Sequence, residues 1–168
     1  MSIILRDEVP LQAVYAAAEA AGGTLTHDIP RSHWASRVLR WSLPDGGRLL
    51  YSEHHVLGVR GFHGASPELP SDDAPALLAR LASPERLTRL RALRGLAFLC
   101  RGQWDPAIWP LVQTDVLHAD PRVHQPALNA LAIAEWAPVE DLLRLHLADA
   151  PWVLRTLERF YGEGAGEE

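Results

Sequence analysis

The sequence predicts an α+β protein in which a small helix-and-sheet domain precedes an all-helical domain. In the first 65 positions, apolar and polar residues alternate on both sides of a turn, whereas from position 72 onward the pattern is helical throughout. Between them, "HGASPELPSDD" at 63–73 is rich in proline, serine and acidic residues and predicts a linker. The 168 residues suffice for one domain or two small ones, which would bury roughly 70% of the unfolded surface.

The amino-terminal domain, 1–65, is expected to place one helix on a three-stranded antiparallel meander. In "DEVPLQAVYAAAEAAGG" at 7–23, apolar residues form a helical stripe that two glycines end. "RVLRWSL" and "RLLYS" alternate on either side of "PDGG" at 44–47, which is typical of a β-hairpin. "VLGVRGFHG" at 56–64 continues as the third strand. This domain resembles no family.

The carboxy-terminal domain, 72–161, is expected to consist of short helices. Serine, alanine or aspartate followed by proline recurs before the predicted helices, as at many helix N-termini. The connections are short enough to make consecutive helices antiparallel neighbours. The expected helices span 72–81, 84–101, 106–117, 121–135, 138–148 and 152–161. The tail "GEGAGEE" at 162–168 is expected to be disordered.

An internal repeat of about 31 residues runs through this helical part. Pro121 and Val123 recur 30 positions later, and Ile108 and Leu111 match apolar residues 31 positions later. The repeat unit contains two helices and is present roughly two and a half times.

These repeats resemble the HEAT-like helical repeat family over residues 72–161. The pattern D-P-x-V-R-x-x-A-x-x-A-L is filled, with His124 in place of the arginine, by Asp120, Pro121, Val123, Ala127, Ala130 and Leu131. The pattern A-x-x-P-L-[IV] is filled by Ala107, Pro110, Leu111 and Val112. The resemblance implies a solenoid of helical hairpins whose second helices line a concave, partner-binding face. Pro126 lies outside the pattern, and because it cannot donate an i→i−4 bond we expect it to kink its helix.

Tryptophans and charges on the second helices suggest a binding face. The chain has six tryptophans, of which Trp104, Trp109, Trp136 and Trp152 lie in the helical part. At the repeat offset of 31, Trp109 would neighbour Glu140, and Gln113 would neighbour Arg144. Aromatic residues beside charges are typical interface anchors. The predicted partner-binding residues are therefore Trp109, Gln113, Asp115, Glu140 and Arg144.

Two of these assignments have a structural alternative. Asp115 lies close to the apolar face of its helix, so it either pairs with an arginine of a neighbouring helix or belongs to a site. The tryptophans either face a partner or fill the space between packed hairpins.

No pattern indicates catalysis, a metal or a cofactor. His54, His55 and His63 could approach one another on adjacent strands, but no cysteine or carboxylate stands at the spacing of a structural zinc site. Nucleophile-elbow, P-loop and H-E-x-x-H motifs do not occur in the sequence. We therefore expect no catalytic residue, no bound metal and no cofactor, and a protein that is not an enzyme.

Charge and composition limit the kinds of molecule that the protein is expected to bind. The net charge is −5, and all 16 basic residues are arginine, which disfavours a general phosphate-backbone binder. No apolar run approaches the ~20 residues of a membrane span, and no signal peptide is evident. The single cysteine, Cys100, fits a reducing compartment. We expect a cytoplasmic protein that binds neither membranes nor nucleic acid.

The sequence thus predicts a non-enzymatic protein-binding module that uses a concave helical face. By analogy it resembles bacterial immunity proteins, inhibitors or adaptors, and its acidic balance suggests a basic protein partner. The alternative is a HEAT-like DNA-binding protein similar to alkylpurine DNA glycosylases, with Asp115, Trp109 and Arg144 in the groove. The partner, the oligomeric state and the role of residues 1–65 remain open at this stage.

Overall fold

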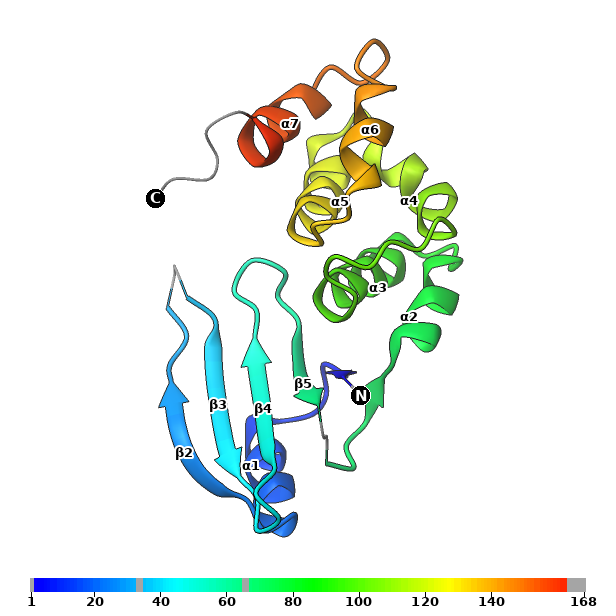
Figure 1. The fold of residues 1–168 in the computed structure, drawn as a ribbon. Helices are drawn as coiled ribbons and strands as arrows, with labels where there is room; N and C mark the ends of the chain where they lie inside the picture. The colour runs from blue at the N-terminus through cyan, green and yellow to red at the C-terminus, as the bar shows by residue number, and fades with distance from the viewer. Residues whose placement is uncertain (1, 33–34, 65–66, 163–168) are drawn as a thin grey trace. The chain divides into compact units, whose positions relative to one another are not determined.

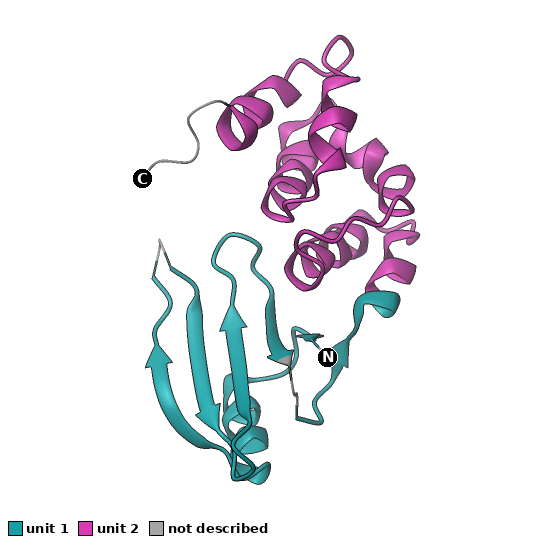
Figure 2. Ribbon diagram, viewed as in Figure 1, with its two compact units in different colours: residues 1–76 teal, residues 77–168 magenta. Residues whose placement is uncertain are grey.

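The computed structural model describes residues 2–32, 35–64 and 67–162. The chain divides into two compact units, residues 1–76 and residues 77–168, shown in Figure 2. We refer to them as the sheet unit and the helical unit and describe each by itself. The boundary falls inside the helix α2 (Ala74–Leu81), a few residues after the predicted linker.

The sheet unit contains a six-stranded, fully antiparallel sheet and one helix, α1 (Leu11–Ala20). The strand order is β2-β3-β4-β5-β1-β6, so β2 forms one edge (Figure 1). The strands are β1 (Ile3–Leu5), β2 (Thr24–Ile29), β3 (Arg37–Ser42), β4 (Arg48–Glu53), β5 (Arg60–Gly64) and β6 (Ser71–Asp72).

One face of the sheet packs against α1 and forms the core of the unit. Alternate residues of β3, such as Leu39 and Trp41, are buried there, and in β4 Tyr51 pairs with Leu39 across the ladder. From α1, Val14 and Ala18 join the same buried cluster. We call this side the helix face and the opposite side the open face. The alternation in the sequence therefore indicated correctly which side of these strands is buried.

The prediction of a three-stranded meander is wrong, because the sheet has six strands. Two of the additional strands, β1 and β6, are only 3 and 2 residues long, too short to show a period. The third, β2, is exposed at all its positions and contains a register shift between Leu25 and His27. This bulge interrupts the alternation of faces by which a strand is recognised in a sequence.

Six helices, α2 to α7, span the region where six were expected. After α2 they are α3 (Arg86–Leu99), α4 (Ile108–Val116), α5 (Pro121–Ile133), α6 (Pro138–Arg144) and α7 (Val153–Tyr161). The start of α5 has the predicted cap, since the Asp120 carboxylate accepts from Arg122 N at 2.8 Å and Pro121 follows. Within the described ranges, none of the helices is long and apolar enough to cross a bilayer.

The helices do not form the expected solenoid with a shared concave face. The central helix α5 packs against α3, α4 and α7, and α7 also packs against α6. The second helices of the repeat, α4 and α6, are not among the extensively packed pairs of the described part. Helix α6 has 7 residues and ends at Arg144 instead of near 148. The sequence repeat predicted which helices form, but it did not predict how they pack against one another. The solenoid prediction is therefore wrong.

Two tryptophans hold helix ends inside the helical unit. Trp136, which is fully buried, donates its indole N–H to the carbonyl of Cys100 at 2.7 Å, just after α3. Trp152 donates in the same way to the carbonyl of Val116 at 3.3 Å, at the end of α4. Carbonyls at a helix C-terminus have no partner within the helix, so each indole satisfies one of them. These tryptophans therefore belong to the packing between helices.

Candidate protein-interaction site

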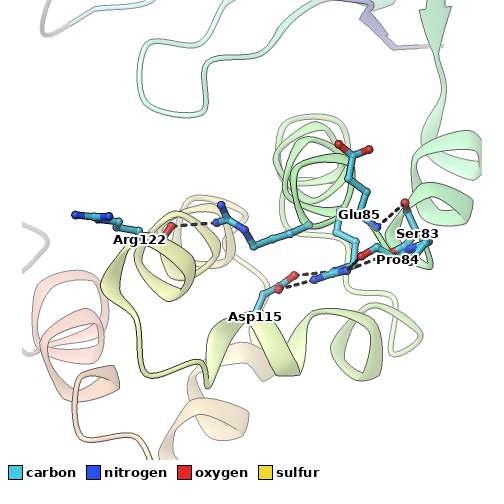
Figure 3. Close-up of polar contacts among 7 residues, drawn as sticks. Ser83, Pro84, Glu85, Asp115 and Arg122 are labelled. Carbon is cyan, nitrogen blue, oxygen red and sulfur yellow. Dashed lines mark hydrogen bonds and ion pairs between the residues drawn. The ribbon is translucent and has the colours of Figure 1, made fainter.

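Asp115, one of the predicted partner-binding residues, is held by an arginine from α3. Arg89 donates from Nε to Oδ2 at 2.9 Å and from Nη2 to Oδ1 at 2.7 Å, and both side chains are largely buried. Its Nη1 donates to the carbonyls of Ser83 and Pro84 at 3.0 and 2.9 Å (Figure 3). The hydrogen bonds to Asp115 raise the pKa of Arg89. Because both carboxylate oxygens are occupied, Asp115 joins α3 to α4 and is not presented to a partner.

A second arginine of α3 compensates for the proline inside α5. The helix is continuous through Pro126, which has no N–H to donate to the carbonyl of Arg122 one turn earlier. Arg86 donates to that carbonyl from Nη1 at 3.2 Å (Figure 3). One turn apart on α3, Arg86 and Arg89 thus satisfy acceptors on two different helices.

The pocket beside these arginines is too small for a ligand. It lies between α3, α4 and α5, and its water-accessible volume is about 10 Å³, room for about one water molecule. Of its charged lining residues, Arg89 and Asp115 are bonded to each other and Arg86 is bonded to the carbonyl of Arg122, and the rest of the lining is apolar. We therefore assign this region to helix packing.

On α4, Trp109 and Gln113 meet a histidine that follows α6. Trp109 is 9% exposed, and its ring stacks on that of His146 with centroids 5.8 Å apart and planes at 28°. The Gln113 amide nitrogen lies 3.4 Å from Nε2 of His146. The structure therefore brings Trp109 and Gln113 together through His146, and among the described residues neither of them makes a hydrogen bond, ion pair or ring contact with Glu140 or Arg144.

Glu140 and Arg144 pair with each other along α6. Arg144 donates to Oε1 of Glu140 from Nη2 at 2.6 Å and from Nε at 3.1 Å, and the two side chains are 52% and 34% exposed. An i,i+4 pair of this kind lies on one side of its helix. Both groups can still contact a partner, because half of the guanidinium side chain and a third of the carboxylate side chain remain accessible.

The most exposed large apolar side chain in the described ranges is Leu145, which is 76% exposed. It stands at the C-terminal end of α6, between Arg144 and His146 in the chain. A lone exposed leucine is ordinary, but the polar residues on either side of this one are held by contacts of their own. We call Gln113, Glu140, Arg144, Leu145 and His146 the α6-end surface.

Sequence reasoning missed two residues of this region, Arg89 and Leu145. The role of Arg89 depends on a contact 26 positions away along the chain, which no local pattern reveals. The exposure of Leu145 depends on where α6 ends, and the last turn of a helix is the least predictable part of it.

Neither a metal-binding group in the described residues nor a similar protein identifies a ligand for this surface. Among the residues that the structure describes, no group of three or more histidine, cysteine, aspartate or glutamate side chains could hold a metal ion. No family model matches the chain, and neither a curated protein nor a solved structure matches it.

The hydroxyl of Tyr161 gives a spectroscopic check on the geometry around Glu140. It is buried without a hydrogen-bond partner in the described ranges, and burial, followed by Glu140 and Glu135, raises its pKa from 10.0 to about 12. The neutral phenol therefore makes its whole contribution to the free energy of unfolding below pH 10, and this contribution is lost as the pH rises towards 12. Ultraviolet titration of tyrosinate should show a late transition that Tyr161→Phe removes, and that variant should gain about 1 kcal/mol. A transition for Tyr161 at its usual pH would contradict this packing.

Proposed function

We propose that the chain is a non-enzymatic module of the inhibitor or adaptor kind that binds another protein through the α6-end surface. The observation that supports this most is the 76% exposure of Leu145 beside the Glu140–Arg144 pair. An exposed leucine loses its contact with water when a partner covers it, and the Arg144 beside it in the chain is of a residue type enriched among the residues that supply most of the binding energy.

The polar groups around Leu145 are already ordered before a partner arrives. Arg144 is held by Glu140, and His146 is held by the ring of Trp109 and the amide of Gln113. Fixing a long side chain on binding costs about 0.5–1.5 kcal/mol, and this cost is reduced where the side chain is already positioned. The partner is expected to offer an apolar pocket for Leu145, and the net charge of −5 favours a basic protein.

The DNA-binding or base-excision alternative receives no support from the geometry. Both oxygens of Asp115 accept hydrogen bonds from Arg89, so this carboxylate is not free to activate water or to stabilise a charged sugar. Trp109 is 9% exposed and stacked on His146, so little of its ring could stack on an extruded base. We therefore retain the protein-binding proposal alone.

Leu145→Asp should abolish co-purification of the partner with the tagged full-length chain. The matched control is Leu87→Asp on α3, because Leu87 is also exposed, at 53%, and lies outside the α6-end surface. Both substitutions add one negative charge at an exposed leucine; the helix dipole favours it in the first turn of α3 and disfavours it at the end of α6, so the two free energies of unfolding should differ by about 1 kcal/mol and both variants should stay folded. Quantitative mass spectrometry of the co-purified proteins is the measurement. Equal retention of every specific partner by Leu145→Asp and by the control would refute the proposal.

A further inference from the structure

The open face of the sheet unit carries positive charge and no acidic side chain over β2 to β5. Cross-strand register assigns Arg40 of β3 to this face opposite His27 of β2, and Arg48 of β4 opposite Ser42 of β3. His63 of β5 lies on it as well, opposite Leu50. Because directly paired residues point to the same side of a sheet, these basic side chains share one surface.

The acidic residues of these strands lie on the helix face instead. Asp28 accepts from the Tyr15 hydroxyl at 2.9 Å and from Arg37 at 3.1 Å, and Glu53 accepts from the Tyr51 hydroxyl at 2.9 Å. They are therefore compensated at the boundary with α1 and cannot neutralise the arginines on the opposite side. The acidic residues of β2 to β5 thus share the helix face with Arg37 and Arg60, whereas the open face keeps basic residues alone, although the whole chain is acidic.

The two arginines of the open face have no side-chain partner among the described residues. Both are exposed, and neither guanidinium makes a hydrogen bond or ion pair with another residue of the ranges that the structure describes. Arg37, by contrast, is bound to Asp28, and Arg60 donates to the carbonyls of Arg6 and Asp7. Since Arg40 pairs with Leu50 and Arg48 with Ser42, the two unpaired guanidiniums are diagonal neighbours, with Cβ atoms about 7–8 Å apart.

Apolar side chains lie among these charges. Ile29 of β2, 46% exposed, pairs with Val38 of β3, and Leu50 of β4 pairs with Arg40. Ser42, Ser52 and Thr24 supply hydroxyl groups on the same face. Along the strands, the Ile29–Val38 pair is followed by the Arg40–Leu50 pair and then by the Ser42–Arg48 pair, so the face offers apolar contact at one end and charge-assisted hydrogen bonds next to it.

We propose that the open face of β2 to β4 binds an acidic, partly apolar segment of another protein. The unpaired Arg40 and Arg48 would hold carboxylates of that segment, and Ile29, Val38 and Leu50 would contact its apolar side chains. This surface is separate from the α6-end surface, and it takes a ligand of the opposite charge.

The chemistry of the face favours a peptide over a nucleic acid. Single strands bind protein sheets through bases stacked on aromatic rings. Among the described open-face positions of β2 to β5 the only rings are the imidazoles of His27 and His63, and the larger aromatic residues Trp41, Tyr51 and Phe62 point to the core. Two unpaired arginines are also fewer than the ~6–10 phosphate contacts of a duplex-binding surface.

The test is an NMR titration of the full-length chain with a synthetic peptide in which glutamate alternates with leucine. We expect chemical-shift changes at the amides of β2 to β4 and at the Nε–Hε groups of Arg40 and Arg48. The double variant Arg40→Glu and Arg48→Glu should bind the peptide at least about tenfold more weakly. It should be about as stable as the parent, because it exchanges two exposed, unpaired like charges for two charges of the opposite sign at the same positions.

The matched control is the double variant Arg122→Glu and Arg155→Glu. These arginines are exposed on α5 and α7, outside both proposed surfaces, and their reversal changes the net charge equally. Its affinity should stay within about twofold of the parent. The proposal is overturned by shifts confined to other residues, by equal weakening in the control, or by tighter binding of a lysine–leucine peptide or a single-stranded oligonucleotide.

Discussion

Asp115→Ala is expected to lower the free energy of unfolding by about 3–5 kcal/mol, because it leaves the guanidinium of Arg89 largely buried without its carboxylate. Asp115 accepts from Arg89 at 2.7 and 2.9 Å, and the side chains of the two residues are only 11% and 19% exposed. The remaining bonds of Arg89, to the carbonyls of Ser83 and Pro84, use only one of its nitrogens. Urea unfolding of the full-length chain gives the difference.

The control for this prediction replaces both members of the pair. Arg89→Met together with Asp115→Leu removes both charges and keeps apolar volume between α3 and α4. Such replacements are often neutral or stabilising, so the double variant should recover most of the loss seen with Asp115→Ala. A loss below about 1 kcal/mol in Asp115→Ala would show that the pair is effectively solvated. Asp115 would then return to the residues available for a partner.

Pro126→Ala is expected to raise the free energy of unfolding by about 2–3 kcal/mol. Proline in a helix interior is about 3 kcal/mol less favourable than alanine, and part of this cost is already offset by the bond from Arg86 to the carbonyl of Arg122. Alanine at 126 restores the N–H that this carbonyl lacks. Thermal and denaturant unfolding both measure the gain.

A double-mutant cycle isolates the bond from Arg86. In the parent chain, Arg86→Leu should cost about 1 kcal/mol, since the carbonyl of Arg122 loses its donor. In the Pro126→Ala background the same substitution should cost close to nothing, because the backbone N–H of residue 126 supplies the bond. Equal costs in the two backgrounds would show that Arg86 and Pro126 are independent.

The sequence was informative where structure depends on near neighbours. The start of α5 follows from Asp120 and Pro121, whose cap acts within one turn. The hairpin of β3 and β4 follows from alternation around a Gly-containing turn, and the buried sides of both strands were predicted correctly. The position of Asp115 near the apolar face of its helix predicted either a pair with an arginine of a neighbouring helix or a place in a site. The structure shows the pair with Arg89.

What the sequence did not reveal depends on contacts between distant segments. The bulge in β2 hides that strand from any search for alternation, and β1 and β6 are too short to show a period. The repeat of about 31 residues predicted two similar hairpins, but α6 has only 7 residues and does not pack extensively on α4 in the described part of the chain. Leu145 could not be identified as exposed before the end of α6 at Arg144 was known.

Photocrosslinking from position 145 decides whether the α6-end surface meets a partner. A photoreactive amino acid replaces Leu145 in one version of the full-length chain and Leu87 in the other, and each is irradiated in a lysate of the organism that encodes the protein. Our proposal requires one defined protein adduct from position 145 that disappears when Arg144→Glu is added, and none from position 87. No adduct from position 145, or the same adduct from both positions, would contradict it.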